Sequence, residues 1–175
     1  LIGFSVVTDE FQWALKWARL IKQRLNVPIV FGNVHPTFHP EEVLNQPCVD
    51  FIVRGEGERT LLELLECLEG KRKAADTLGL GFKENGSIRI NPMRPLIENL
   101  DDLPFPDKDL YYEQMPYLNL GYTTMSGRGC PYGCNWCAKP IHGNSYHSRS
   151  PRAVAEEMHL LKQRYRPDRL WFADD

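Results

Sequence analysis

Three short segments of apolar and β-branched residues recur in the first third of the chain, and each is followed by residues with helical spacing. The segments span residues 1–7, 28–33 and 49–54. Strands that alternate with helices of this length favour a parallel sheet with helices on both faces. We therefore predict an α/β fold here. The first helix is expected to bury one apolar face, made of Phe11, Ala14, Leu15, Ala18 and Leu25. The helix after the third strand is expected to bury Leu61, Leu62, Leu64, Leu65 and Leu68.

The carboxyl ends of these strands form the expected binding edge of the sheet. Ligands of open parallel sheets bind in the crevice outside the carboxyl ends of the strands. Those ends fall here at residues 5–8, 32–35 and 55–57. His35 and His39 follow the second strand, and we expect them to pack within their loop and not to bind the ligand.

A turn signal and a proline-rich stretch separate the two halves of the chain. Asn85-Gly86 predicts a hairpin, because a type I′ turn needs positive φ at both central positions. The prolines that follow restrict φ and predict an extended, semi-rigid linker. They are Pro92, Pro95, Pro104 and Pro106. We predict a first domain at 1–97, a linker at 98–118 and a second domain at 119–175, with the hairpin as part of the connection.

The second half has the pattern of a strand, a loop, a helix and a strand. Residues 119–126 have strand composition, and Ser150-Pro151 form a good N-cap and first-turn pair for a helix. Residues 170–175 end the chain as a strand with two carboxylates at its carboxyl end. The helix between them has apolar residues at helical spacing, namely Val154, Met158, Leu161 and Tyr165.

The loop between these elements carries three cysteines in eight residues. Cys130, Cys134 and Cys137 have C-x3-C-x2-C spacing in a glycine-rich segment. A structural zinc site is closed by four ligands, so three thiolates are an odd number for zinc. A cubane iron–sulfur cluster has four irons, and three cysteines would leave one iron open. Glycines suit a chain that must wrap closely around such a cluster.

Two other readings of the cysteines stay open at this point. A zinc knuckle would recruit His142 or His147 as a fourth ligand. A disulfide framework is less consistent with three cysteines placed so close together. Cys48 precedes a strand-like run and Cys67 lies inside a helical run, and we expect both to be small buried side chains.

With Trp136 just before the third cysteine, this segment resembles the radical S-adenosylmethionine (SAM) superfamily. The resemblance implies a 4Fe-4S cluster held by the three cysteines, whose open iron chelates SAM and whose electron cleaves it to a 5′-deoxyadenosyl radical. It also implies a partial TIM barrel, of which this chain holds the first β-α-β unit. Trp136 would lie near the SAM adenine, with aromatic packing as its alternative role. Asp174 would stand where family members place a Gly-Gly-Glu stretch near the SAM amino group. Arg149 is a further SAM candidate, with a structural ion pair as its alternative role.

The first half resembles the flavodoxin-like cobalamin-binding domain that precedes the radical SAM core in one subgroup. The resemblance rests on GFSVVT, FGNVHPTFHPEEVL and VDFIVRGEGERTLLELL. Ser5-Val6-Val7 stands at the family's S-x-L element and Gly32-Asn33 at its Gly-Gly pair, each with one departure. The D-x-H-x-x-G loop, which can supply a lower axial histidine, would precede this chain. The resemblance implies cobalamin contacts from Ser5, Gly32, Asn33, Gly55 and Glu56. Another nucleotide-like ligand, or none, is the alternative.

Composition narrows the classes of partner. The 175 residues are 42% hydrophobic and carry a formal net charge of −2. This balance gives no general field for binding nucleic acid, and no apolar run approaches the length of a membrane span. The chain lacks an initiator Met and a secretory signal, and it opens and stops in strand-like runs. We expect a fragment of a longer cytoplasmic protein.

The resemblance implies an enzyme that acts on a small-molecule or natural-product-like substrate. A reductant such as flavodoxin or ferredoxin would supply the electron. With cobalamin present, the expected reaction is methylation of an unactivated carbon. Oxidative cyclisation or rearrangement is the alternative reaction, as in the subgroup's magnesium-protoporphyrin ester cyclase-like members. A zinc-stabilised binding module without catalysis is the alternative of another class.

Overall fold

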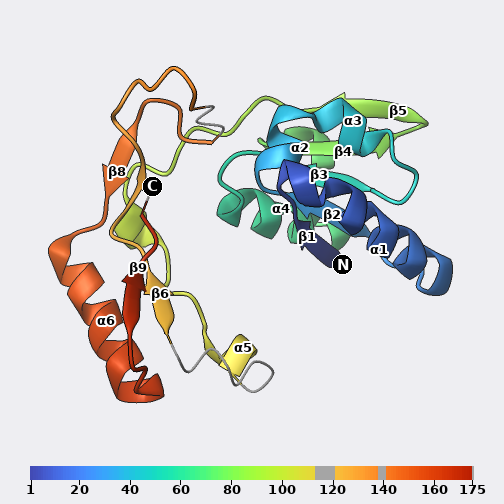
Figure 1. The fold of residues 1–175 in the computed structure, drawn as a ribbon. Coiled ribbons are helices and arrows are strands. Elements are labelled where there is room, and N and C mark those ends of the chain that lie inside the picture. Colours follow the sequence, from blue (N-terminus) through green and yellow to red (C-terminus); the bar gives the residue numbers. More distant parts are fainter. Residues whose placement is uncertain (113–120, 138–140, 175) are drawn as a thin grey trace. The chain divides into compact units, whose positions relative to one another are not determined.

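The computed structural model describes residues 1–112, 121–137 and 141–174. The chain divides into two compact units, Leu1–Leu96 and Ile97–Asp175 (Figure 1). The predicted three-part division stays a prediction, and the end of its linker, like the start of the strand predicted at 119–126, lies outside the described residues.

The first unit is built on a five-stranded sheet in the order β1-β2-β3-β4-β5. Strands β1 (Ile2–Ser5), β2 (Ile29–Gly32) and β3 (Phe51–Val53) are parallel, with Ser5 opposite Gly32 and Val30 opposite Phe51. Helices α1 (Phe11–Arg24), α2 (Val34–Phe38) and α3 (Pro40–Leu44) lie between these strands in sequence. Helix α4 (Glu58–Leu68) follows β3, and short 3-10 turns stand at Thr8–Glu10 and Ala74–Asp76. The α/β alternation predicted for this region is confirmed.

The Asn85-Gly86 hairpin is confirmed as β4 (Leu80–Glu84) and β5 (Ser87–Ile90), but its place differs from the prediction. It is not part of a connector. Strand β4 pairs antiparallel with β3, with Phe51 opposite Phe82, so the hairpin forms one side of the sheet. The hairpin joins the sheet because its apolar side chains are buried there, with Leu80 and Phe82 packed against Val30, Val53 and Leu64.

The core lies on both faces of this sheet. Ile29 and Phe31 of β2 pack with residues of α1 and α3, whereas Val30 packs with Leu64 of α4. Alternate residues of one strand therefore point to opposite cores, as expected for a sheet covered on both sides. The expected buried face of α1 is confirmed except at Leu25, which lies beyond the helix end and is exposed.

Helix α4 departs from its predicted packing. Of the five leucines expected to be buried, only Leu64 is buried. The buried face of the helix is therefore narrow, and its other buried residue is Thr60, one turn earlier. The others are exposed on its flanks, namely Leu61, Leu62, Leu65 and Leu68. The outer face of α1 also carries large side chains, Trp13 and Trp17, whose rings meet edge to face at 6.0 Å.

The second unit contains the predicted β-α-β unit. Strands β6 (Tyr122–Thr124) and β9 (Leu170–Phe172) are parallel, and α6 (Pro151–Tyr165) connects them. The Ser150 hydroxyl accepts a 3.1 Å hydrogen bond from the Ala153 amide, which confirms the predicted N-cap. A 3-10 turn (Leu100–Asp102) and a short helix, α5 (Asp109–Tyr112), precede β6.

A second strand pair was not predicted. Strands β7 (Gly127–Gly129) and β8 (Tyr146–Ser148) are antiparallel and close the base of the loop that carries the cysteines. Throughout the described ranges, no helix has both the length and the apolar character needed to cross a membrane.

Candidate functional site

The carboxyl ends of β1 and β2 are joined through Asn33. Its side-chain amide donates a 3.0 Å hydrogen bond to the Ser5 hydroxyl, and its Oδ1 accepts one of 2.7 Å from the Val34 amide. Its φ of 83° and ψ of −156° lie in a region that favours glycine and that other residues rarely adopt, so the hydrogen bonds of its side chain help to hold a strained backbone. Two residues predicted as cobalamin contacts, Ser5 and Asn33, are thus brought together.

Thr37 joins this group to the end of β3. Its hydroxyl donates to the Asn33 carbonyl oxygen at 2.7 Å and accepts from the Gly55 amide at 3.1 Å. Sequence reasoning missed Thr37. The available signal was a threonine four residues after Asn33, because such a hydroxyl can reach back to the carbonyl one helical turn earlier.

Gly32 and Glu56 complete the predicted set at this edge. A Cβ added at Gly32 would meet only Val53, at 3.6 Å from its carbonyl oxygen, which is ordinary contact. The chain's own packing therefore does not require glycine at this position. A ligand that approaches the backbone closely would require it, so a glycine here is compatible with such a ligand. Glu56 is buried.

His35 is packed inside the loop, as predicted. Its ring lies 4.1 Å from that of Phe11 and only 3% of the residue is exposed. Nδ1 stands 3.4 Å from the Thr8 hydroxyl, and Nε2 finds no hydrogen-bond partner among the described residues. Burial lowers the pKa of His35, with the Glu42 carboxylate opposing that shift and His39 adding to it. His39 is exposed, and its Nδ1 lies 3.8 Å from Glu42.

The three loop cysteines follow strand β7. Cys130 is half-buried, whereas Cys134 and Cys137 are exposed, and none of the three forms a disulfide. The Cys137 amide donates to the Cys134 carbonyl oxygen at 3.2 Å, which forms a tight turn. Within the described ranges, no three His, Cys, Asp or Glu side chains stand close enough to hold a metal ion. The thiols, His142 and His147 are therefore not assembled as a ligand set in the chain by itself.

The chemistry of the donors still fits an iron–sulfur cluster. Three thiols lie on one loop whose base is closed by the β7–β8 ladder, and thiolates are the ligands of such clusters. Cys48 is buried, as predicted, and Cys67 is half-buried with its sulfur 3.5 Å from the Thr77 hydroxyl. Trp136 is 88% exposed.

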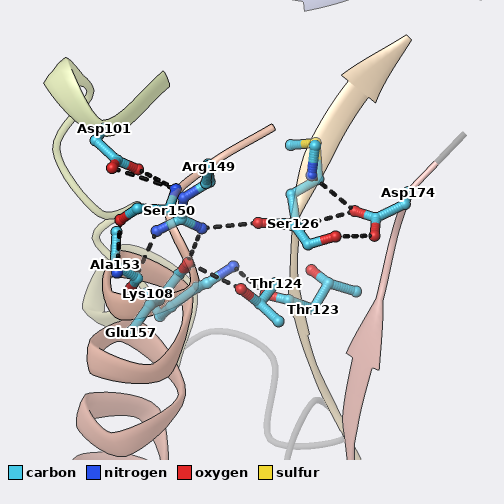
Figure 2. Close-up of polar contacts among 12 residues, drawn as sticks. Asp101, Lys108, Thr123, Thr124, Ser126, Arg149, Ser150, Ala153, Glu157 and Asp174 are labelled. Atoms are coloured by element: carbon cyan, nitrogen blue, oxygen red, sulfur yellow. Dashed lines mark hydrogen bonds and ion pairs between the residues drawn. The ribbon is translucent and has the colours of Figure 1, made fainter. Parts of the chain in front are cut away.

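Asp174 lies at the end of β9 and faces the strand that leads into the cysteine loop (Figure 2). Its carboxylate accepts hydrogen bonds from the amide and hydroxyl of Ser126, the former at 2.7 Å, and from the Gly127 amide at 3.3 Å. Burial alone would raise the pKa of Asp174, but these hydrogen bonds outweigh it and hold the pKa below its ordinary value.

Arg149 lies at the other end of the cysteine loop and is paired with Glu157 of α6 (Figure 2). Glu157 is buried and also accepts a 2.8 Å hydrogen bond from the Thr124 hydroxyl. The Arg149 guanidinium donates to the Met125 carbonyl oxygen at 2.8 Å and lies over the Phe105 ring, 5.4 Å from its centroid. The structural ion pair considered for Arg149 is therefore present. Glu157 was not identified from the sequence, since a buried glutamate within an apolar stripe is recognisable only from its partners.

Known proteins resemble this chain along its whole length. The B12 binding domain family matches residues 1–65. An uncharacterized methyltransferase of Pyrococcus horikoshii is 36% identical over 181 residues, which cover 100% of this chain and 39% of that protein. The anaerobic magnesium-protoporphyrin IX monomethyl ester cyclase of Synechocystis is 31% identical over 166 residues, covering 90% of this chain and 32% of the cyclase. The chain thus spans less than half the length of these relatives.

A solved structure shows the same fold. The cobalamin-dependent SAM radical enzyme OxsB, with aqua-cobalamin bound, superposes with a TM-score of 0.83 at 24% identity. The match covers 100% of this chain and 25% of that one. The expected class is confirmed: an α/β protein with a parallel-rich sheet of the flavodoxin-like, cobalamin-binding type.

Proposed function

Because this chain belongs to the cobalamin-binding subgroup of the radical SAM superfamily, we propose that the protein carrying it is a radical SAM methyltransferase. It cleaves SAM reductively and methylates an unactivated carbon of a small-molecule substrate. The observation that carries the proposal is the donor set: three cysteine thiols, none in a disulfide, within one loop that a strand pair closes at its base.

Cys130, Cys134 and Cys137 hold the cluster in this proposal. When bound, the cluster supplies the electron that cleaves SAM to a 5′-deoxyadenosyl radical, and cobalamin supplies the carrier for the methyl group. The chain's contribution is to orient these groups. The loop carries the three thiols within eight residues, Cys134 and Cys137 are exposed, and the exposed indole of Trp136 directly precedes the third cysteine.

The carboxyl ends of β1, β2 and β3 hold cobalamin in this proposal. Ser5, Asn33 and Thr37 lock those ends to one another by hydrogen bonds, so the edge is organised before any ligand arrives. Gly32 leaves the approach clear, and Gly55 and Glu56 form the adjoining turn. The match of the B12 binding domain family to residues 1–65 supports this site.

A second reaction is supported by one specific relative. The Synechocystis cyclase is 31% identical over 90% of this chain, so oxidative cyclisation is the second candidate. Product analysis with SAM labelled in its methyl group separates the two reactions. Methylation places the labelled carbon in the product, whereas cyclisation yields a product with a new ring and no label.

Metal analysis tests the radical SAM proposal against a zinc-stabilised module. The full-length protein, reconstituted without oxygen, should hold about four irons and four sulfides, since each cubane has four iron corners and three are met by cysteine. Its visible absorbance should bleach on reduction, and a reductant such as flavodoxin, ferredoxin or dithionite should drive formation of 5′-deoxyadenosine from SAM. Stoichiometric zinc without iron would overturn the proposal.

A further inference from the structure

The cysteine loop is anchored at both ends by charged side chains. The loop runs from β7 to β8, and its entry and exit are marked by Ser126 and Arg149. The Arg149 amide donates a 2.8 Å hydrogen bond to the Ser126 carbonyl oxygen, so the two ends touch directly. Everything that fixes either end therefore also fixes the base of the loop.

Asp174 holds the entry. Both of its carboxylate oxygens are engaged, one by the Ser126 hydroxyl and the other by the Ser126 and Gly127 amides. The Ala173 amide also donates to the Thr124 carbonyl oxygen at 2.9 Å, which continues the β6–β9 pairing up to this point. The end of β9 is thus bonded to the entry of the loop through main chain and side chain alike.

Arg149 and Glu157 hold the exit. One guanidinium nitrogen of Arg149 serves both Glu157 and the Met125 carbonyl oxygen, and the other approaches the Ala153 carbonyl oxygen at 3.4 Å. Glu157 is 2% exposed, so its charge depends on Arg149 and on the Thr124 hydroxyl for compensation. If the arginine were redirected to a SAM carboxylate, a buried carboxylate would be left without its cation, which is strongly unfavourable.

We propose that Asp174 and the Arg149–Glu157 pair are positioning residues that fix the base of the cysteine loop, and that neither Asp174 nor Arg149 contacts SAM through its side chain. The inference rests on the proposed function for the role of the loop, and it reassigns two residues that the sequence suggested as SAM contacts. A loop that must present three thiolates to one cluster loses less entropy on loading when its two ends are already fixed.

The test compares variants of the full-length protein at the buried pair and at a matched exposed pair. Glu157→Gln and Arg149→Lys weaken the Arg149–Glu157 ion pair. Glutamine removes the negative charge, and lysine keeps the positive charge but lacks the planar guanidinium fork. Ser126→Ala and Asp174→Asn weaken the entry more mildly. The control is the exposed Arg152–Glu156 pair on the same helix, joined at 2.8 Å and altered by Arg152→Gln.

Three readouts separate positioning from SAM binding. Amide hydrogen exchange of residues 127–137 and 141–148 in the cluster-free protein should rise by about tenfold in the variants of Ser126, Arg149, Glu157 and Asp174 and stay unchanged in the control. Iron content after reconstitution should fall in parallel. In the iron-loaded fraction, the dissociation constant for SAM, measured by calorimetry, should stay within about twofold of wild type, since no direct contact is lost.

The opposite pattern would overturn the proposal. Unchanged exchange and iron content, with SAM affinity weakened tenfold or more in Asp174→Asn or Arg149→Lys, would make these residues ligand contacts. If Glu157→Gln does not fold, the milder Ser126→Ala and Asp174→Asn decide by the same exchange measurement. Because exchange is measured without a cluster, it remains decisive even if the wild-type protein takes up no iron, a result that would count against the proposed function alone.

Discussion

The Asn33 side chain donates a 3.0 Å hydrogen bond to the Ser5 hydroxyl, from the residue after β2 to the last residue of β1. The same asparagine has a φ of 83° and caps the amide of Val34. One residue therefore supplies both the backbone turn and the cross-strand bond at the edge assigned to cobalamin.

This dual role predicts different outcomes for two substitutions. Asn33→Ala should lower the free energy of unfolding by about 1–2 kcal/mol more than Asn33→Gly, because alanine is strained at positive φ and glycine is not. Both variants should weaken hydroxocobalamin binding, since both lose the bond to Ser5. Urea unfolding followed by circular dichroism and an absorbance titration measure the two effects. Equal stability of the two variants would contradict the role of the backbone angle.

Substitution of Gly32 should have little effect on the stability of the fold, and a bulky side chain there should weaken cobalamin binding. Gly32→Ala meets only ordinary contacts within the chain, so its free energy of unfolding should stay within about 0.5 kcal/mol of wild type. Gly32→Leu should weaken hydroxocobalamin binding by crowding the ligand. Gly79→Ala is the matched control: its φ is +77° and an added Cβ would lie 3.1 Å from the Arg54 carbonyl oxygen. The control should cost about 1–3 kcal/mol of stability. If Gly32→Leu binds cobalamin with the same affinity as wild type, cobalamin does not bind at this edge of the sheet.

Cys134→Ala should abolish SAM cleavage. Its thiol is exposed in the described loop, and its loss leaves two cysteines for a cluster that needs three. Formation of 5′-deoxyadenosine measures the effect, and iron content should fall with it. Cys67→Ser is the control, since Cys67 lies on α4, outside the loop, and faces the Thr77 hydroxyl. A Cys134→Ala protein that still cleaves SAM would disprove the ligand assignment.

His35 should make the stability of the first unit depend on pH. Burial lowers the pKa of His35 in the folded chain, with Glu42 and His39 as the other charged groups that act on it. The unfolded chain therefore binds a proton more readily, and the free energy of unfolding should fall as pH drops below the ordinary histidine pKa of about 6.5. Above that pH the neutral ring carries no penalty.

The measurement is urea unfolding across pH 5 to 8, in wild type and in His35→Phe. Phenylalanine keeps a ring against Phe11 and cannot titrate, so the variant should lose less stability on acidification. His39→Gln, at an exposed position, should not flatten the profile to the same extent. If wild type and His35→Phe have the same slope, His35 is not the group responsible.

Local patterns allowed much of the fold to be predicted from the sequence. The strand and helix alternation of residues 1–68, the Asn85-Gly86 turn and the Ser150 cap all depend on near neighbours in the chain. The cysteine spacing is likewise local. These features needed only periodicity and turn chemistry to be recognised.

Features that depend on distant partners could not be predicted in the same way. The hairpin joins the sheet because Phe82 meets Phe51, a pairing across about thirty residues. Thr37 and Glu157 became identifiable only once Gly55 and Arg149 were placed beside them. The exposed leucines of α4 show the same limit. Apolar residues at helical spacing predict that the helix has a buried face, but the width of that face depends on the elements that pack against it.

The tryptophans have a practical consequence for spectroscopy. All four lie at the surface: Trp13, Trp17, Trp136 and Trp171 are 64%, 44%, 88% and 55% exposed. Indole fluorescence responds to the polarity around the ring, and these rings already meet water in the folded chain. Emission should therefore shift little on denaturation, which is why circular dichroism is the better observable for the stability measurements above. Whatever covers Trp136 should instead register directly as quenching or a blue shift, making the intrinsic fluorescence of this chain a reporter of contacts at its surface and not of its core.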